Sequence, residues 1–260
     1  MKIVVCIKQV PDTTEVKLDP KTGTLIREGV PSIINPDDKS GLEAALQVKD
    51  QNGAEVIVLT MGPPQADEAL REALAMGADR AILLTDRAFA GADTWATSSA
   101  IAGALRKIDF DVVIAGRQAI DGDTAQVGPQ IAEHLHLPSV TYVDDLELGD
   151  GSIIVKRAFE DGHHKIKIKT PCLITTLKEM NESRYMRVSG IYDAYKDDKV
   201  EVWSVADIEV DPENLGLKGS PTKVKKSFTK GAKTAGKVFD VDAKEAAKII
   251  VDKLKETYII

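Results

Sequence analysis

Cysteine and aromatic residues are scarce in this chain of 260 residues. There are two cysteines, Cys6 and Cys172, and aromatic residues make up 5% of the sequence. Both cysteines lie in apolar runs typical of strands, so neither a disulfide framework nor a zinc site is expected. The core must therefore consist mainly of Ala, Val, Ile and Leu, the usual filling between helices and a parallel sheet.

Long hydrophobic runs are also missing. No segment approaches the ~18 consecutive apolar residues of a membrane span, and the opening run KIVVCIK is too short for a signal peptide. The chain has 34 basic and 41 acidic residues, a net charge of −7 that argues against nucleic acid as a partner. We expect a cytoplasmic protein without a membrane span.

Recognisable catalytic motifs are absent too. The sequence contains no G-x-G-x-x-G after a strand, no P-loop and no G-x-S-x-G elbow. No Ser/His/Asp, Cys/His or paired-carboxylate arrangement is evident. His134 and His136 fall at a predicted helix end, where the helix dipole favours them. His163 and His164 fall in a predicted turn without the spacing of metal ligands. We predict no metal site and no catalytic residue.

Alternating strand and helix patterns fill the first half of the chain. Apolar runs over 2–8, 55–60, 81–84 and 111–115 are each followed by helical spacing, which predicts four βα units. The helix expected over about 93–107 has a small face of Ala96, Ser99, Ala100 and Gly103, suited to close approach to the sheet. Gly77 is placed to end the helix before it. A small hairpin is expected from 16–18 and 24–26.

The pattern changes after Pro138. Residues 139–148, 152–159, 164–169 and 172–177 indicate strands, with turns at Asp150-Gly151 and Asp161-Gly162. In HKIKIK, Ile and Lys alternate, so one face is exposed to water. We expect an antiparallel extension of the parallel sheet, or a small sheet beside it.

The segment from about Lys218 to Lys237 has a different composition. It contains seven lysines, no acidic residue and almost no core residues, so it cannot pack on its own. An amphipathic helix follows, with Ala243, Ala246, Ala247, Ile250 and Leu254 on one face. We predict a Rossmann-like nucleotide-binding domain over 1–216, and over 217–260 a lysine-rich arm plus helix. The arm is either a solvated tail or a segment that crosses another subunit.

Ligands of open parallel sheets bind at the carboxyl ends of the strands. The loops expected there are 8–13, 61–64 and 116–129, and the last reads GRQAIDGDTAQVGP. Gly116 and Gly122 permit unusual backbone conformations. Asp123 or Thr124 could cap the next helix, and its free amides could receive a phosphate. Composition alone favours Asp121 and Asp123 as turn and cap residues, and Cys6 as an inert core residue.

At GRQAIDGDTAQVGPQIAEHL the sequence resembles the small (beta) subunit of electron-transferring flavoproteins. The resemblance covers nearly the whole chain. It includes, in order, the segments VVCIKQVPDT, INPDDKSGLEAAL, TMGPPQADEALREALAMGAD, VKRAFEDGHHKIKIKTPCLITT, NESRYM and GSPTKV. The resemblance implies a Rossmann-like fold of the adenine nucleotide alpha-hydrolase type and a heterodimer with a larger alpha subunit that carries FAD. It also implies that the small subunit binds AMP in some members and a second FAD in others.

The family's nucleotide contacts carry over by position. They would be Cys6, Asn35, Pro36, Asp37, Asp38, Met61, Gly116, Arg117, Gln118, Ala119, Ile120, Asp121, Gly122, Asp123, Thr124, Ala125, Gln126 and Val127. The backbone near Cys6 and Met61 would sandwich the adenine, and Asn35 would bond the ribose or a base edge. Asp121 and Asp123 would shape the loop or accept from ribose hydroxyls. The amides of 124–127 would hold the phosphates, with donors added by Gln126 and Thr124. Some AMP-binding members have Asn and Thr where Ala125 and Val127 stand here.

VPDT at 10–13 resembles the anaerobic, electron-bifurcating members. In that group the small subunit's FAD accepts hydride from NADH. One electron goes to ferredoxin, and the other goes through the alpha-subunit FAD to an acyl-CoA, enoyl-CoA-type or hydroxy-acid dehydrogenase. By position, Arg184, Tyr185 and Val188 would dock the dehydrogenase, with Val188 as the apolar anchor, and the lysine-rich arm would embrace the alpha subunit.

Three hypotheses therefore stand: a bifurcating FAD subunit, a subunit that binds AMP structurally, and a stand-alone adenine-nucleotide-binding regulator. We expect no catalysis from the chain alone, because redox chemistry would belong to the flavin.

Overall fold

The computed structural model describes residues 1–12, 31–196, 198–225 and 236–260. Its internal contacts divide the chain into two units, Met1–Lys225 and Lys226–Ile260, which are considered separately below. The hairpin expected over 16–18 and 24–26 lies outside the described residues.

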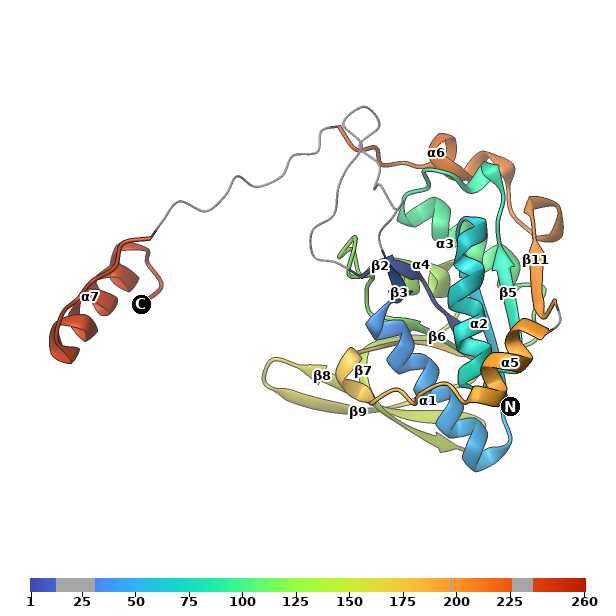
Figure 1. Ribbon diagram of the computed structural model, residues 1–260, viewed down its shortest axis with the longest axis horizontal. Coiled ribbons are helices and arrows are strands. Elements are labelled where there is room, and N and C mark those ends of the chain that lie inside the picture. The colour runs from blue at the N-terminus through green and yellow to red at the C-terminus, as the bar shows by residue number, and fades with distance from the viewer. Residues whose placement is uncertain (13–30, 197, 226–235) are drawn as a thin grey trace. The chain divides into compact units, whose positions relative to one another are not determined.

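The first unit is built on a mixed sheet that is parallel over most of its width (Figure 1). Its nine described strands lie in the order β11 (Val200–Trp203), β5 (Arg80–Leu84), β4 (Glu55–Met61), β1 (Lys2–Cys6), β6 (Val112–Gly116), β10 (Cys172–Thr176), β7 (Ser139–Gly149), β8 (Ser152–Phe159) and β9 (Gly162–Lys169). Every neighbouring pair from β11 to β7 is parallel, and β8 and β9 continue antiparallel. The predicted α/β fold and its antiparallel extension are confirmed.

Strand β10 lies in a different part of the sheet than expected. The sequence pattern places residues 172–177 in the antiparallel extension, but β10 lies inside the parallel part, between β6 and β7. All five residues of β10 are buried, as expected for a strand covered on both faces. A separate antiparallel ribbon joins β2 (Gln9–Pro11) to β3 (Ser32–Ile34).

Helices cover both faces of the sheet (Figure 1). Alternate side chains of β1 point to opposite faces. Ile3 and Val5 join one core cluster with residues of α1 and α2, whereas Val4 and Cys6 join a second cluster with residues of α3 and α4. The helices of this unit are α1 (Pro36–Asn52), α2 (Asp67–Met76), α3 (Thr94–Leu105), α4 (Val127–His134), α5 (Val188–Lys196) and α6 (Gly216–Gly219). Short 3-10 turns cover Pro64–Ala66, Arg87–Phe89, Lys178–Met180, Val205–Asp207 and Pro212–Asn214.

Helix ends follow the sequence signals only in part. Gly77 ends α2, as predicted, and its amide donates to the carbonyl oxygens of Ala73 and Leu74. The helix predicted from residue 124 begins at Val127, and Gln126 occupies its N-cap position without a side-chain cap bond. The predicted capping roles of Asp123 and Thr124 are therefore wrong.

The face of α3 that carries small residues packs against the sheet and also against a later segment of the chain. Ala96 and Ala100 are buried, and Ala100 belongs to the core cluster on that face. Gly103 instead faces a later segment: a Cβ added there would lie 2.8 Å from the carbonyl oxygen of Glu209. The amide of Glu209 donates to the carbonyl oxygen of Gly103. The small side chain at 103 admits this segment rather than the sheet.

Two of the histidines have defined partners. His134 ends α4, as expected, and burial and the nearby Arg106 lower the pKa of its imidazole. Its Nε2 atom lies 3.1 Å from Ser98 Oγ, which ties α4 to α3. His163 lies in strand β9 rather than in a turn, and its Nε2 atom is 2.7 Å from Asp144 Oδ2.

The division between the units falls after Lys225, later in the chain than the predicted boundary at 216. Residues just beyond 216 are held by the first unit. The Oγ of buried Ser220 accepts from the amide of Asp93, and the amide and hydroxyl of Thr222 both donate to Asp93 Oδ2.

The second unit contains α7 (Ala243–Glu256), capped by Asp242, whose carboxylate accepts from the amides of Lys244 and Glu245. None of the residues of α7 is buried, and Ile250 and Val251 are exposed. Among the described residues, no helix is long and apolar enough to cross a membrane. The described part of the chain also holds no group of three or more His, Cys, Asp or Glu side chains suited to a metal ion.

The close packing of α1 on the sheet gives a test of this fold. A Cβ at Gly41 would lie 2.7 Å from Thr176 Oγ1 and 2.8 Å from Ile114 Cγ2. We expect Gly41→Ala to lower the free energy of unfolding by about 1–3 kcal/mol in urea denaturation, because overpacking outweighs the gain in helix propensity. Gln51→Ala, at an exposed position of the same helix, should change it by less than about 0.5 kcal/mol. A stabilised Gly41→Ala variant would contradict the packing.

Candidate nucleotide-binding site

A large cavity opens at the carboxyl ends of the central strands. Its volume is about 1060 Å³, at the upper end for small-molecule sites. It is lined by residues that follow β1, β4, β5 and β6. The chain leaves β1 toward β4 on one side and later returns to β6 on the other. The cavity therefore lies at the topological switch point, where open α/β sheets bind ligands.

Cys6 lines the floor of the cavity as a core residue. It is buried at the end of β1, and this burial, with the nearby Asp38, raises the pKa of its thiol to about 12. A thiol with so high a pKa holds almost no thiolate at neutral pH and is a poor nucleophile. Cys6 therefore contributes shape to the site rather than reactivity.

Asp38, at the start of α1, joins the two central loops of the cavity. Its Oδ2 accepts from the amide of Lys8 at 2.8 Å, and its Oδ1 accepts from the amide of Gly116 at 2.9 Å. Burial raises the pKa of Asp38 to about 7, although these amides and Asn35 favour the charged form. The carboxylate thereby holds the loop after β1 in register with the loop after β6.

Asn35 supports the loop after β6 from behind. The side chain is fully buried, its Nδ2 donates to the carbonyl oxygen of Gln118 at 2.9 Å, and its Oδ1 accepts from the amide of Ile120 at 3.1 Å. Because both ends of the amide hold this loop, Asn35 does not face the cavity as the expected ribose contact would.

Asp37 and Arg117 form a second brace beside Asp38. Arg117 Nε lies 3.3 Å from Asp37 Oδ2, and Asp37 Oδ1 accepts from the amide of Lys178. Burial raises the pKa of Asp37, and the positive charge of Arg117 opposes this. Asp37 and Asp38 are of a residue type that often caps helices, but here they hold neighbouring segments, and α1 begins without a side-chain cap.

Residues 124–128 end the loop after β6 and begin α4, and they line the cavity, so their amides are the outward amides of this site. Asp123 and Ala125 have positive φ values of 50° and 52°, and such alternation of backbone conformation produces anion-binding concavities. Among the described residues, none accepts a hydrogen bond from the amides of 124–128. The start of α4 is therefore available to a phosphate, as the sequence suggested.

The predicted contact residues divide into two groups. Those that line the cavity are Cys6, Asp38, Met61, Gly116, Arg117, Gln118, Ala119, Gly122, Thr124, Ala125, Gln126 and Val127. Those that do not line it are Asn35, Pro36, Asp37, Ile120, Asp121 and Asp123. In the second group Asn35 and Asp37 are buried, whereas Ile120 and Asp123 are exposed. Three of its members hydrogen-bond to neighbouring segments: Asn35, Asp37 and Asp123.

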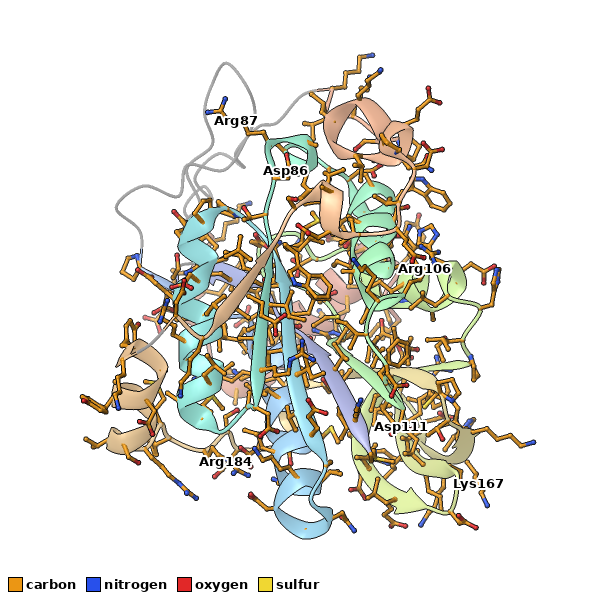
Figure 2. All side chains as sticks on the ribbon, turned by 90° about the vertical axis from the view of Figure 1, so that its right-hand side faces the viewer. Asp86, Arg87, Arg106, Asp111, Lys167 and Arg184 are labelled. Atoms are coloured by element: carbon orange, nitrogen blue, oxygen red, sulfur yellow. The ribbon has the colours of Figure 1, made fainter. Side chains whose placement is uncertain are left out.

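One wall of the cavity was not predicted from the sequence. The segment from Thr85 to Thr97, which follows β5, lines it together with Thr222 (Figure 2 labels Asp86 and Arg87 there). The signal was present, because the loop after residues 81–84 also follows a parallel strand. Thr222 had no local signal, since it reaches the wall through its long-range bonds to Asp93.

The lining suits an adenine nucleotide. Apolar side chains that could contact a flat base come from several elements: Met61, Pro63, Pro64, Phe89, Ile101 and Ile131. The open amides of the loop before α4 provide donors for phosphates. Apolar walls with a few placed polar groups are typical of cofactor sites, so the residues present fit a nucleotide or a dinucleotide.

The three predicted docking residues occupy a separate surface. Tyr185 and Val188 are 95% and 85% exposed. Arg184 is anchored instead, because its Nε lies 2.8 Å from Glu43 Oε2 and its Nη2 lies 2.9 Å from Asp50 Oδ2. In Figure 2, Arg184 lies at the end of the molecule opposite to Asp86 and Arg87.

Comparison with known proteins gives consistent matches. The family model described as "Electron transfer flavoprotein domain" matches residues 22–208. The chain is 61% identical over 260 residues to the electron transfer flavoprotein subunit beta of Clostridium acetobutylicum, with both chains covered completely. It is 58% identical to the caffeyl-CoA reductase-Etf complex subunit CarD of Acetobacterium woodii, again with complete coverage of both chains. It is 46% identical to the acryloyl-CoA reductase electron transfer subunit gamma of Anaerotignum propionicum, also over the whole of both chains.

Two glycines of the loop after β6 give a matched test of the site. A Cβ at Gly116 would overlap Asp38 Oδ1 and lie 2.8 Å from the Asp38 amide nitrogen, whereas a Cβ at Gly122 meets nothing within 4 Å. We expect Gly116→Ala to lower the free energy of unfolding by about 1–3 kcal/mol and to reduce bound nucleotide. Gly122→Ala should change neither. Urea denaturation and nucleotide extraction measure the two effects, and equal behaviour of the two variants would refute the Asp38 bridge.

Proposed function

Because this chain belongs to the electron transfer flavoprotein family, we propose that it is the small subunit of an electron-bifurcating flavoprotein and binds FAD in the cavity. The observation that carries this proposal is the cavity itself. It combines an apolar wall with a loop whose outward amides make no bond to the described residues. In this proposal the chain passes electrons from NADH to ferredoxin and, through the alpha-subunit FAD, to a partner dehydrogenase.

The protein's own contribution is binding and orientation. When bound, a flavin supplies the hydride and single-electron chemistry that side chains lack. Met61 and the prolines after it, which line the cavity, would contact the base, and the amides of 124–128 would hold the phosphates. Asp38 and Asn35 hold the loops that follow β1 and β6 in place. No residue of the chain carries out a chemical step by itself.

The names of two relatives support a dehydrogenase partner. CarD is named as a subunit of a caffeyl-CoA reductase-Etf complex. The relative from Anaerotignum propionicum is named as an electron transfer subunit of acryloyl-CoA reductase. Both names describe reductases of CoA thioesters. We propose that this chain serves a dehydrogenase of the acyl-CoA or enoyl-CoA type in the cytoplasm, rather than a hydroxy-acid dehydrogenase.

The second candidate is a subunit that binds AMP without a redox role. It is favoured by the same amides and the same apolar wall, which any adenylate would use. It is disfavoured by Ala125 and Val127, whose side chains offer no hydrogen bond to a phosphate. The third candidate, a stand-alone regulator, leaves the apolar side chains of α7 without a partner.

The second unit fits contact with the alpha subunit. Val238, Phe239 and Ile250 are exposed beside or within α7, and the described ends of the arm carry lysines. Exposed apolar side chains of this kind mark interaction surfaces. We propose that 217–260 embraces the alpha subunit, and that Tyr185 and Val188 face the dehydrogenase while Arg184 anchors their segment to α1.

Cofactor content tests the proposal directly. The chain would be co-expressed with its alpha subunit and purified, and the nucleotides would be extracted and counted. We expect two FAD per heterodimer. One FAD and one AMP would support the second candidate, and a monodisperse chain that binds neither and needs no partner would contradict both.

The docking role of Val188 has a matched control in Val202. Both valines are exposed, at 85% and 62%, and Val202 lies on edge strand β11. We expect Val188→Ala to raise the KM of the heterodimer for its dehydrogenase by about 5- to 30-fold, as for an interface anchor worth about 1–2 kcal/mol, with unchanged flavin content. Val202→Ala should leave this KM unchanged. An unchanged KM in both variants would place the docking surface elsewhere.

A further inference from the structure

Three basic residues in the described part of the chain line the cavity: Lys8, Arg87 and Arg117. Arg117 is committed to the buried carboxylate of Asp37. Arg87 lies on the wall that follows β5, two strands away from β1. Lys8 lies two residues after the end of β1, at the switch point, and contacts Asp121 of the loop that precedes α4. It is therefore the basic side chain of the three that is placed at this loop without being paired to a buried carboxylate of α1.

The backbone of Lys8 is fixed from both sides. Its amide donates to Asp38 Oδ2 at 2.8 Å, and its carbonyl oxygen accepts from the amide of Asn35 at 2.8 Å. Because these two bonds fix the backbone of Lys8, the position from which its side chain extends is also fixed. The side-chain torsions can still change to let the ammonium group contact a ligand.

The ammonium group of Lys8 lies against the loop that begins after β6. Its Nζ is 2.6 Å from Asp121 Oδ1, and Asp121 precedes the outward amides by three residues. The side chain of Asp121 is 8% exposed and does not line the cavity, whereas that of Lys8 is 41% exposed and does. The ammonium therefore lies between a shielded carboxylate and the open cavity.

An ammonium group has three donors. Within the described part of the chain, Lys8 Nζ donates only to Asp121. The remaining donors can reach a ligand in the cavity while the ion pair with Asp121 holds the group in place. A phosphoryl oxygen is the ligand group that such a point charge favours.

We infer that Lys8 recognises the phosphates of the bound adenine nucleotide and makes the site selective for nucleotides over nucleosides. Lys8 keeps its ion pair with Asp121 and donates a further charge-assisted hydrogen bond to a phosphoryl oxygen. The loop amides hold the same phosphates from the side of α4. This inference rests on the proposed nucleotide site. It adds that the Lys8 ammonium group binds the negatively charged phosphates.

Calorimetric titration of the nucleotide-free full-length chain with ADP and with adenosine tests the inference. We expect Lys8→Met to weaken ADP by about 10- to 100-fold, the range for a charge-assisted hydrogen bond, and to leave adenosine unchanged. Lys2→Met is the matched control. Lys2 lies at the start of β1, at the opposite end of this strand from Lys8, is 43% exposed and pairs with Asp109. It removes an equal charge and should alter neither affinity.

A double variant distinguishes binding of phosphate by Lys8 from mere neutralisation of the Asp121 charge by Lys8. In Lys8→Met the carboxylate of Asp121 loses the ammonium group of Lys8, and its negative charge would then act more strongly on a phosphate. Lys8→Met/Asp121→Asn removes that repulsion. We expect its ADP affinity to stay at least tenfold below that of the wild type. Restoration of the wild-type affinity would show that Lys8 only shields Asp121 and would overturn the inference.

The remaining outcomes also decide. An unchanged ADP affinity in Lys8→Met, or an equal loss for ADP and adenosine, overturns the role of Lys8 while the nucleotide site itself stands. Failure of the wild-type chain to bind either ligand contradicts the proposed site and the inference together.

Discussion

The arrangement of this protein depends on one buried carboxylate. Asp38 accepts hydrogen bonds from two backbone amides that are distant in the sequence, those of Lys8 and Gly116. One amide follows β1 and the other lies at the end of β6, and between these two strands the chain changes direction across the sheet. A carboxylate in this position is costly to bury unless its oxygens are bonded. The backbone must therefore bring both loops to it, and the cavity is the space that remains between them and the neighbouring strands.

The rest of the site follows from this constraint. Asn35 and Asp37, on either side of the same helix start, hold the next residues of the loop after β6 through Gln118, Ile120 and Arg117. Since these side chains hold the loop from behind, its amides are left to face the cavity. Binding chemistry is thus assigned mainly to backbone groups and to Lys8, and the acidic residues serve to position them. A site of this kind suits a protein whose reactivity comes from a bound cofactor.

Local sequence patterns predicted much of the fold because strand and helix periodicity are local properties. The parallel sheet, the position of three loops at the carboxyl ends of its strands and the end of α2 at Gly77 were all predicted from the sequence. What failed depended on distant contacts. Asp37 and Asp38 resemble helix caps, yet β6 and the segment at Lys178 bind their carboxylates. The place of β10 beside β6 and the contact of Gly103 with Glu209 involve partners far along the chain, which no local pattern reveals.

The central claim is that an adenine nucleotide lies between the loops that Asp38 joins. A crystal structure of the purified heterodimer with the alpha subunit tests it most directly. The account predicts electron density for an adenine nucleotide at the carboxyl ends of β1, β4 and β6, with its phosphates against the start of α4. It also predicts that Asp38 still bridges the amides of Lys8 and Gly116. A nucleotide bound elsewhere on this chain, or a cavity filled by side chains of either subunit, would contradict the account.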